Sequence, residues 1–499
     1  MTLLETLILG SYFFVLVLLG LYGWHRYYLV YAYHKNKDRA PGPPPAWRGP
    51  LPPVTIQLPL YNEMYVVDRL LKATARIDYP KELLEIQILD DSTDETTEVA
   101  RRGAEALAEQ GFDVRLIHRM DRSGYKAGAL DAGLKVARGE FVAIFDADFV
   151  PSRDFLMRTV PYFQDEQIAM VQARWGHVNA GYSTLTGVQA ILLDAHFVLE
   201  HGSRNRAGHF FNFNGTAGIW RREVIPAAGG WQHDTLTEDL DLSYRAQLLG
   251  WKFLFLPDLV APAELPVEMN AFKSQQHRWA KGSIQVCLKL LPRILQSDQP
   301  FGVKAEAFLH LTANFNYLLM SALSLLMFPS MVIRYNMGWY EMLLIDVPLF
   351  FAATASVVNF YVVSQRELYP DWKARLRHVP VLMAVGIGLA VNNTRAVLEA
   401  LLGHQTAFAR TPKYGVERGS DAWVGKKYMQ GAALQPLIET GLGVYFTATV
   451  FYALANGLYG SLPFLMLFQG GFLYMGLMSF IQQFSGGEAV LNTQVARGK

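Results

Sequence analysis

Residues 140–149 read EFVAIFDADF, an apolar run of strand length that ends in two aspartates, Asp146 and Asp148. Similar runs lie upstream, and helical patterns separate them. The runs are 54–59, 85–89 and 114–117, and the helical patterns are 65–77, 95–109 and 126–137. Strands that alternate with helices predict a mostly parallel, doubly wound α/β sheet. Ligands of such sheets bind beyond the carboxyl ends of the strands, where the two aspartates are expected to lie.

The spacing of Asp146 and Asp148 suits a hard divalent cation. Two carboxylates one residue apart on an extended chain end can bracket Mg²⁺ or Mn²⁺, which also binds phosphate oxygens. Such a cation would neutralise charge on a departing nucleoside diphosphate. The alternative is a solvated turn at the end of the strand, which the preceding strand and the other acidic clusters make less favourable.

Two further acidic clusters have both a functional and a plain structural interpretation. Asp90 and Asp91 close the run at 85–89 and are placed to accept hydrogen bonds from a nucleobase and a ribose, whereas Asp94 caps the next helix. Glu238 and Asp239 precede a helical pattern at 240–248, where a carboxylate is stabilised by the helix dipole. The functional interpretation makes Asp239 a general base for an acceptor hydroxyl, with Glu238 as the other carboxylate that can fill this role.

Cationic and aromatic side chains complete the predicted site. Arg278, on a helical stretch with Gln275 and Trp279, would offer its planar guanidinium to a diphosphate, and Trp279 would stack on a sugar ring. In isolation such an Arg-Trp pair is more often packing. Lys126 opens a helix after a glycine turn and is a second candidate cation for phosphate.

Composition points to a membrane protein with a large polar domain. The chain has 499 residues, 51% of them hydrophobic, and a net charge of +1, which gives no reason to expect nucleic acid as a partner. Its one cysteine, Cys287, excludes an internal disulfide and a cysteine-based zinc site. The first 20 or so residues form a span without a basic leader, so we expect a retained anchor.

We predict five membrane spans, with the N-terminus outside and the C-terminus inside. They are roughly 3–22, 308–333, 342–363, 434–454 and 462–481. The stretch 379–402 is apolar only in its first half, and basic loops flank it on both sides. Both loops are cytosolic only if this stretch lies along the membrane interface. Residues 283–296 also form an amphipathic pattern typical of an interfacial helix.

The predicted spans carry polar and aromatic groups that lipid-facing helices avoid, and a glycan path is one interpretation of them. They are Asn314, Asn316, Tyr317, Asn359, Tyr361, Glu439 and Tyr445. Buried polar groups in membranes face a bundle interior or a wet cavity. The alternative is hydrogen bonding between helices.

The order of the motifs DDSTD, DAD, TED and QQHRW resembles the family 2 inverting glycosyltransferases, specifically the processive membrane synthases. The segments VQARWGHVN (171–179), FNGTAGIWR (213–221) and ELPVEMNAFKSQQHRWAKG (264–282) resemble cellulose synthase-like enzymes that make β-1,4-mannan or a β-1,4-glucan backbone. AFARTPK (407–413) is similar to the gating loop of cellulose synthases, with Phe408, Thr411 and Lys413 in the matching places.

This resemblance implies a GT-A-type domain and a role for each predicted site residue. Asp91 would bind the nucleotide, Asp146 and Asp148 the diphosphate and metal, and Asp239 would be the base. Gln275, Arg278 and Trp279 would border the acceptor and the diphosphate. Asn214 replaces the acceptor-side cysteine of cellulose synthases, which is a departure from their pattern.

We therefore expect a processive glycosyltransferase that polymerises a β-1,4-linked mannan, glucomannan or glucan from UDP-glucose or GDP-mannose and passes it into the bilayer. The expected parts are an anchor (1–35), a cytosolic GT-A domain (36–283), and interfacial helices, a gating-like loop (403–427) and a span bundle within 284–499. The membrane would be the cell membrane in a bacterium and the Golgi in a eukaryote. Transfer of one sugar to a lipid such as ceramide or diacylglycerol is the first alternative, and a transporter with a nucleotide-binding regulatory domain is the second.

Overall fold

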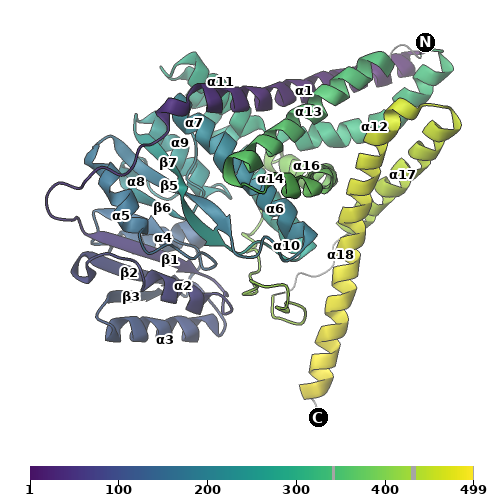
Figure 1. Ribbon diagram of the computed structural model, residues 1–499. Helices are drawn as coiled ribbons and strands as arrows, with labels where there is room; N and C mark the ends of the chain where they lie inside the picture. The colour runs from purple at the N-terminus through teal and green to yellow at the C-terminus, as the bar shows by residue number, and fades with distance from the viewer. Residues whose placement is uncertain (340–342, 429–433, 498–499) are drawn as a thin grey trace.

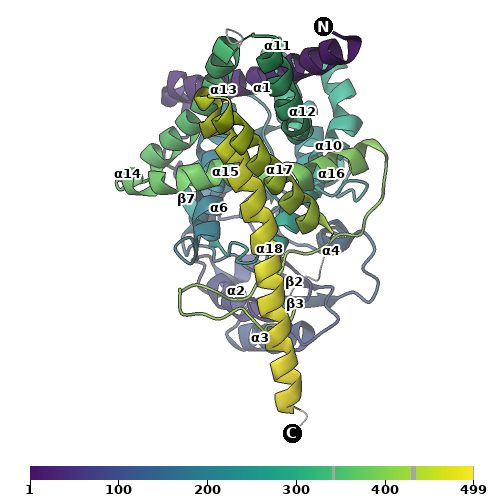
Figure 2. The same cartoon turned by 90° about the vertical axis from the view of Figure 1, so that its right-hand side faces the viewer.

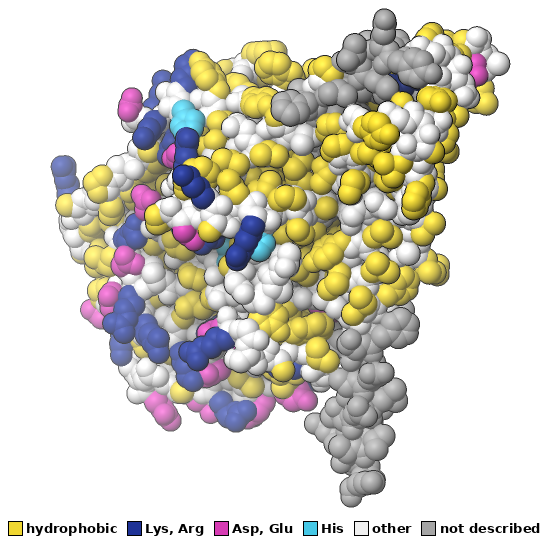
Figure 3. Space-filling view, turned by 45° about the vertical axis from the view of Figure 1, so that its right-hand side comes forward, with side chains coloured by type: hydrophobic (Ala, Val, Ile, Leu, Met, Phe, Trp, Pro, Cys, Tyr) yellow, Lys and Arg dark blue, Asp and Glu magenta, His cyan; other side chains and the backbone are white. Residues whose placement is uncertain are grey.

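The computed structural model describes residues 1–339, 343–428 and 434–497. An α/β domain lies on one side of the molecule, and long helices extend from it on the other (Figure 1). Apolar side chains gather over the helical part, whereas charged side chains gather over the α/β domain (Figure 3).

The α/β domain is built on a seven-stranded sheet with the order β3-β2-β1-β4-β6-β5-β7. The strands are β1 (Val54–Leu60), β2 (Leu84–Asp90), β3 (Asp113–His118), β4 (Phe141–Ile144), β5 (Ile168–His177), β6 (Gly218–Arg221) and β7 (Lys252–Ala263). All neighbouring pairs are parallel except those of β6, which runs antiparallel to both β4 and β5. This mixed sheet is the GT-A arrangement, which confirms the predicted fold class and the four predicted strands.

Helices cover both faces of the sheet. They are α2 (Val67–Thr74), α3 (Thr96–Glu109), α4 (Tyr125–Leu134), α5 (Phe155–Thr159), α6 (Thr184–Ala195), α7 (Gly202–Ala207), α8 (Val224–Ala227), α9 (Glu238–Leu248) and α10 (Met269–Gln296). Successive side chains of a strand point to opposite faces. Accordingly, Phe141 and Ala143 of β4 belong to the same buried cluster as Leu70 of α2, whereas Val142 and Ile144 belong to that of Leu130 of α4. Burial on both faces explains why this strand is apolar throughout.

Nine helices lie outside this core among the described residues: α1 (Leu3–Lys35), α11 (Phe301–Thr312), α12 (Phe315–Asn336), α13 (Leu343–Leu368), α14 (Trp372–Arg375), α15 (Val379–Gly388), α16 (Ala390–Leu401), α17 (Gln435–Ala455) and α18 (Leu462–Arg497). Five helical segments in the described part are long and apolar enough to cross a membrane: Leu3–Lys35, Phe315–Asn336, Trp372–Leu401, Gln435–Ala455 and Tyr459–Gln483. In the side view, α15 and α17 lie beside the upper half of α18 (Figure 2), where Phe446 and Phe472 pack together.

The apolar helices match the predicted spans with three differences. The span predicted at 308–333 begins at Phe315, because the chain turns between α11 and α12. The span predicted at 342–363 lies partly outside the described residues. The stretch 379–402, expected along the interface, largely coincides with the segment Trp372–Leu401, which has the length and composition of a span. Its polar Asn392 is satisfied within the protein, since it donates to the Lys273 carbonyl at 2.8 Å.

Helix α10 runs through the predicted boundary between 283 and 284. It is one helix from Met269 to Gln296, so the predicted amphipathic stretch 283–296 is the second half of the helix that carries Arg278 and Trp279. Its polar and charged groups contact the membrane helices. Lys273 donates to Ser479 Oγ at 2.7 Å and is paired with Glu439, and the Met269 N–H donates to Gln482 at 2.7 Å.

Candidate functional site

A solvent-open cleft lies at the carboxyl ends of the central strands. Almost every residue that the sequence predicts for the site lines it: Asp91, Lys126, Asp146, Asp148, Asn214, Glu238, Asp239, Gln275, Arg278, Trp279, Phe408, Thr411 and Lys413. These residues come from the α/β domain, from α10 and from the loop between α16 and α17. Three segments distant in sequence therefore build one cavity.

Asp90 is the exception, and its expected contact with a nucleotide is not supported by its position. Its side chain is fully buried and does not line the cleft. The carboxylate accepts from the Ser92 N–H at 3.0 Å and lies 2.8 Å from His118 Nδ1. Because β2 continues through Asp90, this side chain stays inside the sheet, and only Asp91 reaches the cleft.

Lys126 is aimed into the cleft by a tight turn at the start of α4. Gly124 and Tyr125 have φ of +72° and +50°, a conformation that glycine adopts without strain. The Lys126 ammonium contacts Asp146 and donates to the Gly215 carbonyl at 2.9 Å. Burial alone would lower the pKa of Lys126, but the charges of Asp146 and Glu238 raise it. A stable cation therefore lies beside the Asp-x-Asp pair.

Glu238 and Asp239 open helix α9 at the floor of the cleft. Asp239 Oδ1 accepts from the Leu240 N–H at 2.8 Å, and the helix dipole favours a negative charge there. Burial opposes this: it raises the pKa of Asp239 to about 7, and the neighbouring charge of Glu238 adds to the shift. A carboxyl group with this pKa is suited to take up a proton near neutral pH.

Helix α10 brings a cation and an aromatic ring to the opposite wall. The Arg278 guanidinium lies 4.5 Å from the centre of the Phe408 ring, and that ring stacks on Tyr125 at 5.7 Å. Trp279 lies 6.5 Å from Trp175, ring centre to ring centre. The site thus offers flat rings beside charged groups, which suits a ligand that combines a sugar with a phosphate.

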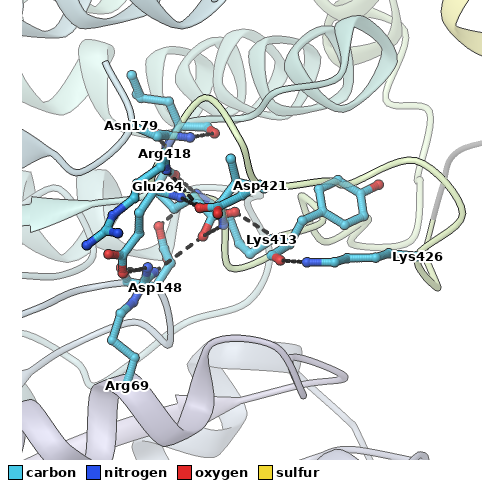
Figure 4. A network of polar contacts seen from close by, with 12 residues as sticks. Arg69, Asp148, Asn179, Glu264, Lys413, Arg418, Asp421 and Lys426 are labelled. Atoms are coloured by element: carbon cyan, nitrogen blue, oxygen red, sulfur yellow. Dashed lines mark hydrogen bonds and ion pairs between the residues drawn. The ribbon is translucent and has the colours of Figure 1, made fainter. Parts of the chain in front are cut away.

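The loop 403–427 lies in the cleft and is held by buried carboxylates. Lys413 Nζ is 2.7 Å from Asp148 Oδ2, and Glu264 accepts from the backbone N–H of Tyr414 at 2.7 Å and of Val416 at 3.2 Å (Figure 4). Arg69 donates to Glu264 at 3.3 Å from the other side. The resemblance to a gating loop thus corresponds to a segment that contacts the Asp-x-Asp pair directly.

Two arginines and a tryptophan at or beside the cleft were not predicted from the sequence. Arg119 holds Asp91 through two nitrogens, at 2.8 and 2.6 Å, and Arg122 lies 3.3 Å above the Tyr61 ring at the edge of the cleft. No local pattern marks these arginines, because their partners are distant in sequence. Trp175 lies in the motif VQARWGHVN, whose pattern alone indicates no role for this ring.

Some of the buried polar atoms without a hydrogen-bond partner belong to residues that line this cleft. Within the described part of the chain, Trp175 Nε1, Asn214 Oδ1, Thr237 Oγ1 and Thr411 Oγ1 are inaccessible and make no hydrogen bond. Such groups are rare in folded proteins because each costs free energy. A polar ligand with many hydroxyl groups would satisfy them.

The donor atoms of the Asp-x-Asp pair are chemically suited to a divalent cation. Asp146 and Asp148 supply carboxylate oxygens at the cleft, the donor that Mg²⁺ and Mn²⁺ prefer. No cluster of three or more His, Cys, Asp or Glu ligands exists among the described residues.

Two of the residues predicted to line a glycan path have partners on other helices. Glu439 is paired with Lys273 and accepts from Gln435 at 2.9 Å, and the Tyr445 hydroxyl donates to the Leu325 carbonyl at 3.2 Å. For these two residues, hydrogen bonding between elements explains the polar side chain. The remaining residues of that set stay predictions.

Comparison with known proteins agrees with the geometry of the cleft. Residues 52–282 match the family model described as glycosyltransferase like family 2. This segment is a family 2 glycosyltransferase domain. It ends within α10, just after Arg278 and Trp279, so it contains both the Asp-x-Asp pair and the QQHRW motif.

The relatives of this family 2 domain include plant enzymes. The chain is 42% identical over 252 residues to glucomannan 4-beta-mannosyltransferase 7 of Arabidopsis thaliana (50% of this chain, 45% of the relative). It is 44% identical over 253 residues to glucomannan 4-beta-mannosyltransferase 1 of Oryza sativa subsp. japonica (50% and 49%). The matches thus span about half the length of these relatives.

Among solved structures, the mannosyltransferase PcManGT from Pyrobaculum calidifontis in complex with GDP-Man and Mn2+ is 20% identical. The match covers 78% of this chain and 99% of that one, with a TM-score of 0.49. A likeness at this level does not extend to substrate or metal.

Proposed function

We propose that the chain is an inverting hexosyltransferase that lengthens a β-1,4-linked glycan from a nucleotide sugar at a membrane. One observation carries this: a single cleft joins a carboxyl group with a pKa near neutrality, Asp239, to an Asp-x-Asp pair and the cations Lys126 and Arg278. These are the groups needed to activate an acceptor hydroxyl and to stabilise a departing diphosphate. The family 2 domain supports the assignment.

In the proposed reaction Asp239 takes the proton of the acceptor hydroxyl, which attacks the anomeric carbon of an α-linked donor and leaves a β-linkage. Lys126 and Arg278 lie near the Asp-x-Asp pair and stabilise the negative charge of the leaving diphosphate. Asp91, held by Arg119, faces the nucleotide. Gln275, Trp279 and Asn214 border the acceptor.

Asp146 and Asp148 would hold a divalent cation, Mg²⁺ or Mn²⁺. When bound, this cation neutralises diphosphate charge. In the structure Lys126 contacts Asp146 and Lys413 contacts Asp148. We infer that both lysines shift their contacts to phosphate oxygens when donor and cation occupy the cleft.

For the donor we propose a mannosyl nucleotide, GDP-mannose, over UDP-glucose. The support is the identity of 42–44% with relatives named as glucomannan 4-beta-mannosyltransferases. The product would be mannan or glucomannan.

We further propose that the domain at 36–283 faces the cytosol and that the helices outside it pass the product into the membrane. Phe408, Thr411 and Lys413 of the loop 403–427 line the cleft, so this loop can close over each donor in turn. Repeated closure favours polymerisation over transfer of one sugar to a lipid.

The test is a donor panel on purified membranes that contain the full chain. Radiolabelled GDP-mannose, UDP-glucose and GDP-glucose are supplied with Mg²⁺ or Mn²⁺, and the product is analysed for size and linkage. We expect a polymer with β-1,4-linked mannose. Label found only in a chloroform-soluble glycolipid would establish the lipid alternative, and no incorporation from any donor would overturn the proposal.

A further inference from the structure

The side chain of Asn214 lies between the cleft and a histidine. Asn214 lines the cleft, and its Nδ2 is 3.0 Å from His196 Nε2. Its Oδ1 is buried and has no hydrogen-bond partner in the described part of the chain. A buried amide oxygen of this kind is unfavourable unless a bound group donates to it.

His196 and Glu200 determine which end of the amide contacts the ring. His196 Nδ1 lies 2.8 Å from Glu200 Oε2. Burial alone would raise the pKa of Glu200, but His196 and Arg204 hold it well below its ordinary value, so the group is a carboxylate and can only accept. In the structure the Asn214 NH₂, which can only donate, faces His196 Nε2, so Nε2 accepts there and Nδ1–H donates to Glu200. This leaves Oδ1 as the free end.

Arg204 supports the contacts between Asn214, His196 and Glu200. His196 and Glu200 lie one turn apart on a π-helical segment, His196–His201, between α6 and α7, and such segments are frequent at functional sites. Arg204 lies 3.6 Å from Glu200 and donates to Glu306 at 2.9 Å. The carboxylate is thus held in place independently of any ligand.

The neighbours of Asn214 identify the acceptor side of the cleft. The next residue, Gly215, has φ of +78°, and a Cβ there would lie 2.9 Å from Asp239 Oδ2. Asn214 is therefore close to the carboxylate that we propose as the base. A hydroxyl group that reaches Oδ1 would therefore lie near Asp239.

We infer that Asn214 Oδ1 accepts a hydrogen bond from a hydroxyl group of the acceptor sugar, and that His196 and Glu200 are positioning residues that keep the amide in this orientation. The inference rests on the proposed function for the identity of the acceptor. It adds a recognition element where cellulose synthases have a cysteine.

The test measures equilibrium binding of β-1,4-mannotetraose to the purified full chain, alongside kcat and KM for its extension. Asn214→Leu keeps the volume and removes the acceptor, and His196→Phe keeps the ring and frees the amide to flip. A neutral hydrogen bond corresponds to about three- to tenfold in affinity. Both variants should weaken tetraose binding by this factor and leave the KM for the donor unchanged.

His196→Gln is the conservative variant, because its amide oxygen can accept from Asn214 while its NH₂ donates to Glu200. It should restore binding, and His34→Phe, at an exposed histidine on α1, is the matched control. If His196→Gln binds tetraose as weakly as His196→Phe does, the positioning role is wrong. Asn214→Leu binding as wild type, or a wild type that binds no tetraose, would overturn the inference. Wild type that binds tetraose but transfers no sugar would refute the proposed function alone.

Discussion

At the scale of single residues, a substitution at Asp239 can remove the proposed base while keeping the shape of the side chain. Asp239→Asn keeps the hydrogen bond from the Leu240 N–H and removes the basic group. General bases contribute about 10²–10⁴-fold to rate, so we expect turnover to fall by this factor with near-normal binding of donor. Turnover close to wild type, measured as label incorporated per minute, would mean that Glu238 or another group is the base.

The pH dependence follows from the same residue. Asp239 must be ionised to accept a proton, and its pKa is raised to about 7 by burial and by Glu238. Activity should therefore be about half-maximal near pH 7, approach its maximum about one pH unit higher, and decline about tenfold per unit well below pH 7. Glu238→Gln removes the neighbouring charge, so the acidic limb of its pH–rate profile should move to lower pH. An unchanged limb would show that Glu238 does not influence this titration.

Asp148 tests the proposed cation. Asp148→Ala removes one of two carboxylate ligands, so transfer should collapse while the protein still folds and inserts. EDTA should abolish wild-type activity, and added Mg²⁺ or Mn²⁺ should restore it. Full activity of the wild type in EDTA would contradict a metal-dependent reaction.

At the scale of elements, the sequence predicts what short-range patterns encode and misses what distant contacts determine. Strands β1 to β4 are apolar runs bounded by polar residues, and they were predicted. Strand β7 contains Pro257 and Pro262, which argue locally against a strand, yet its pairing with β5 keeps it extended. The same holds for the site. Residues in sequence motifs were predicted, whereas Arg119 was not, because only the fold brings it to Asp91.

The loop 403–427 yields a prediction at this scale, because Glu264 is its buried anchor. The Glu264 carboxylate accepts two backbone N–H groups of the loop, and removing a partner from a buried donor costs about 1–3 kcal/mol. Glu264→Ala should therefore loosen the loop, and limited trypsin digestion should cleave faster at Arg418 and Lys426. Glu109→Gln, at an exposed glutamate of α3, is the control and should digest as wild type. Equal cleavage rates for Glu264→Ala and wild type would contradict the anchoring role.

At the scale of the whole molecule, the path of residues 372–401 decides the topology. Both ends of this segment contact the domain side: His378 lies against Gly187 of α6, and Glu399 pairs with Lys281 of α10 at 3.0 Å. These contacts favour a segment that lies along the interface, as the basic loops predict. Cysteines placed singly near Arg375 and near Lys426, in a Cys287→Ser background, should then both be labelled from the cytosolic side. Labelling from opposite sides would mean that the segment crosses the bilayer.

The continuity of α10 has a practical consequence for how this protein can be handled. The homologous segment ends at residue 282, in the middle of that helix, and Lys273 in its first half is held by Glu439 of α17 and Ser479 of α18. A fragment that ends at residue 282 would lose the second half of the helix that carries Arg278. The side of the remaining half that contacts α17 and α18 would then be exposed to water. The helices α17 and α18 thus support the part of α10 that carries Arg278. We expect a fragment without the membrane helices to aggregate and to be inactive. The smallest functional unit should therefore extend through α18.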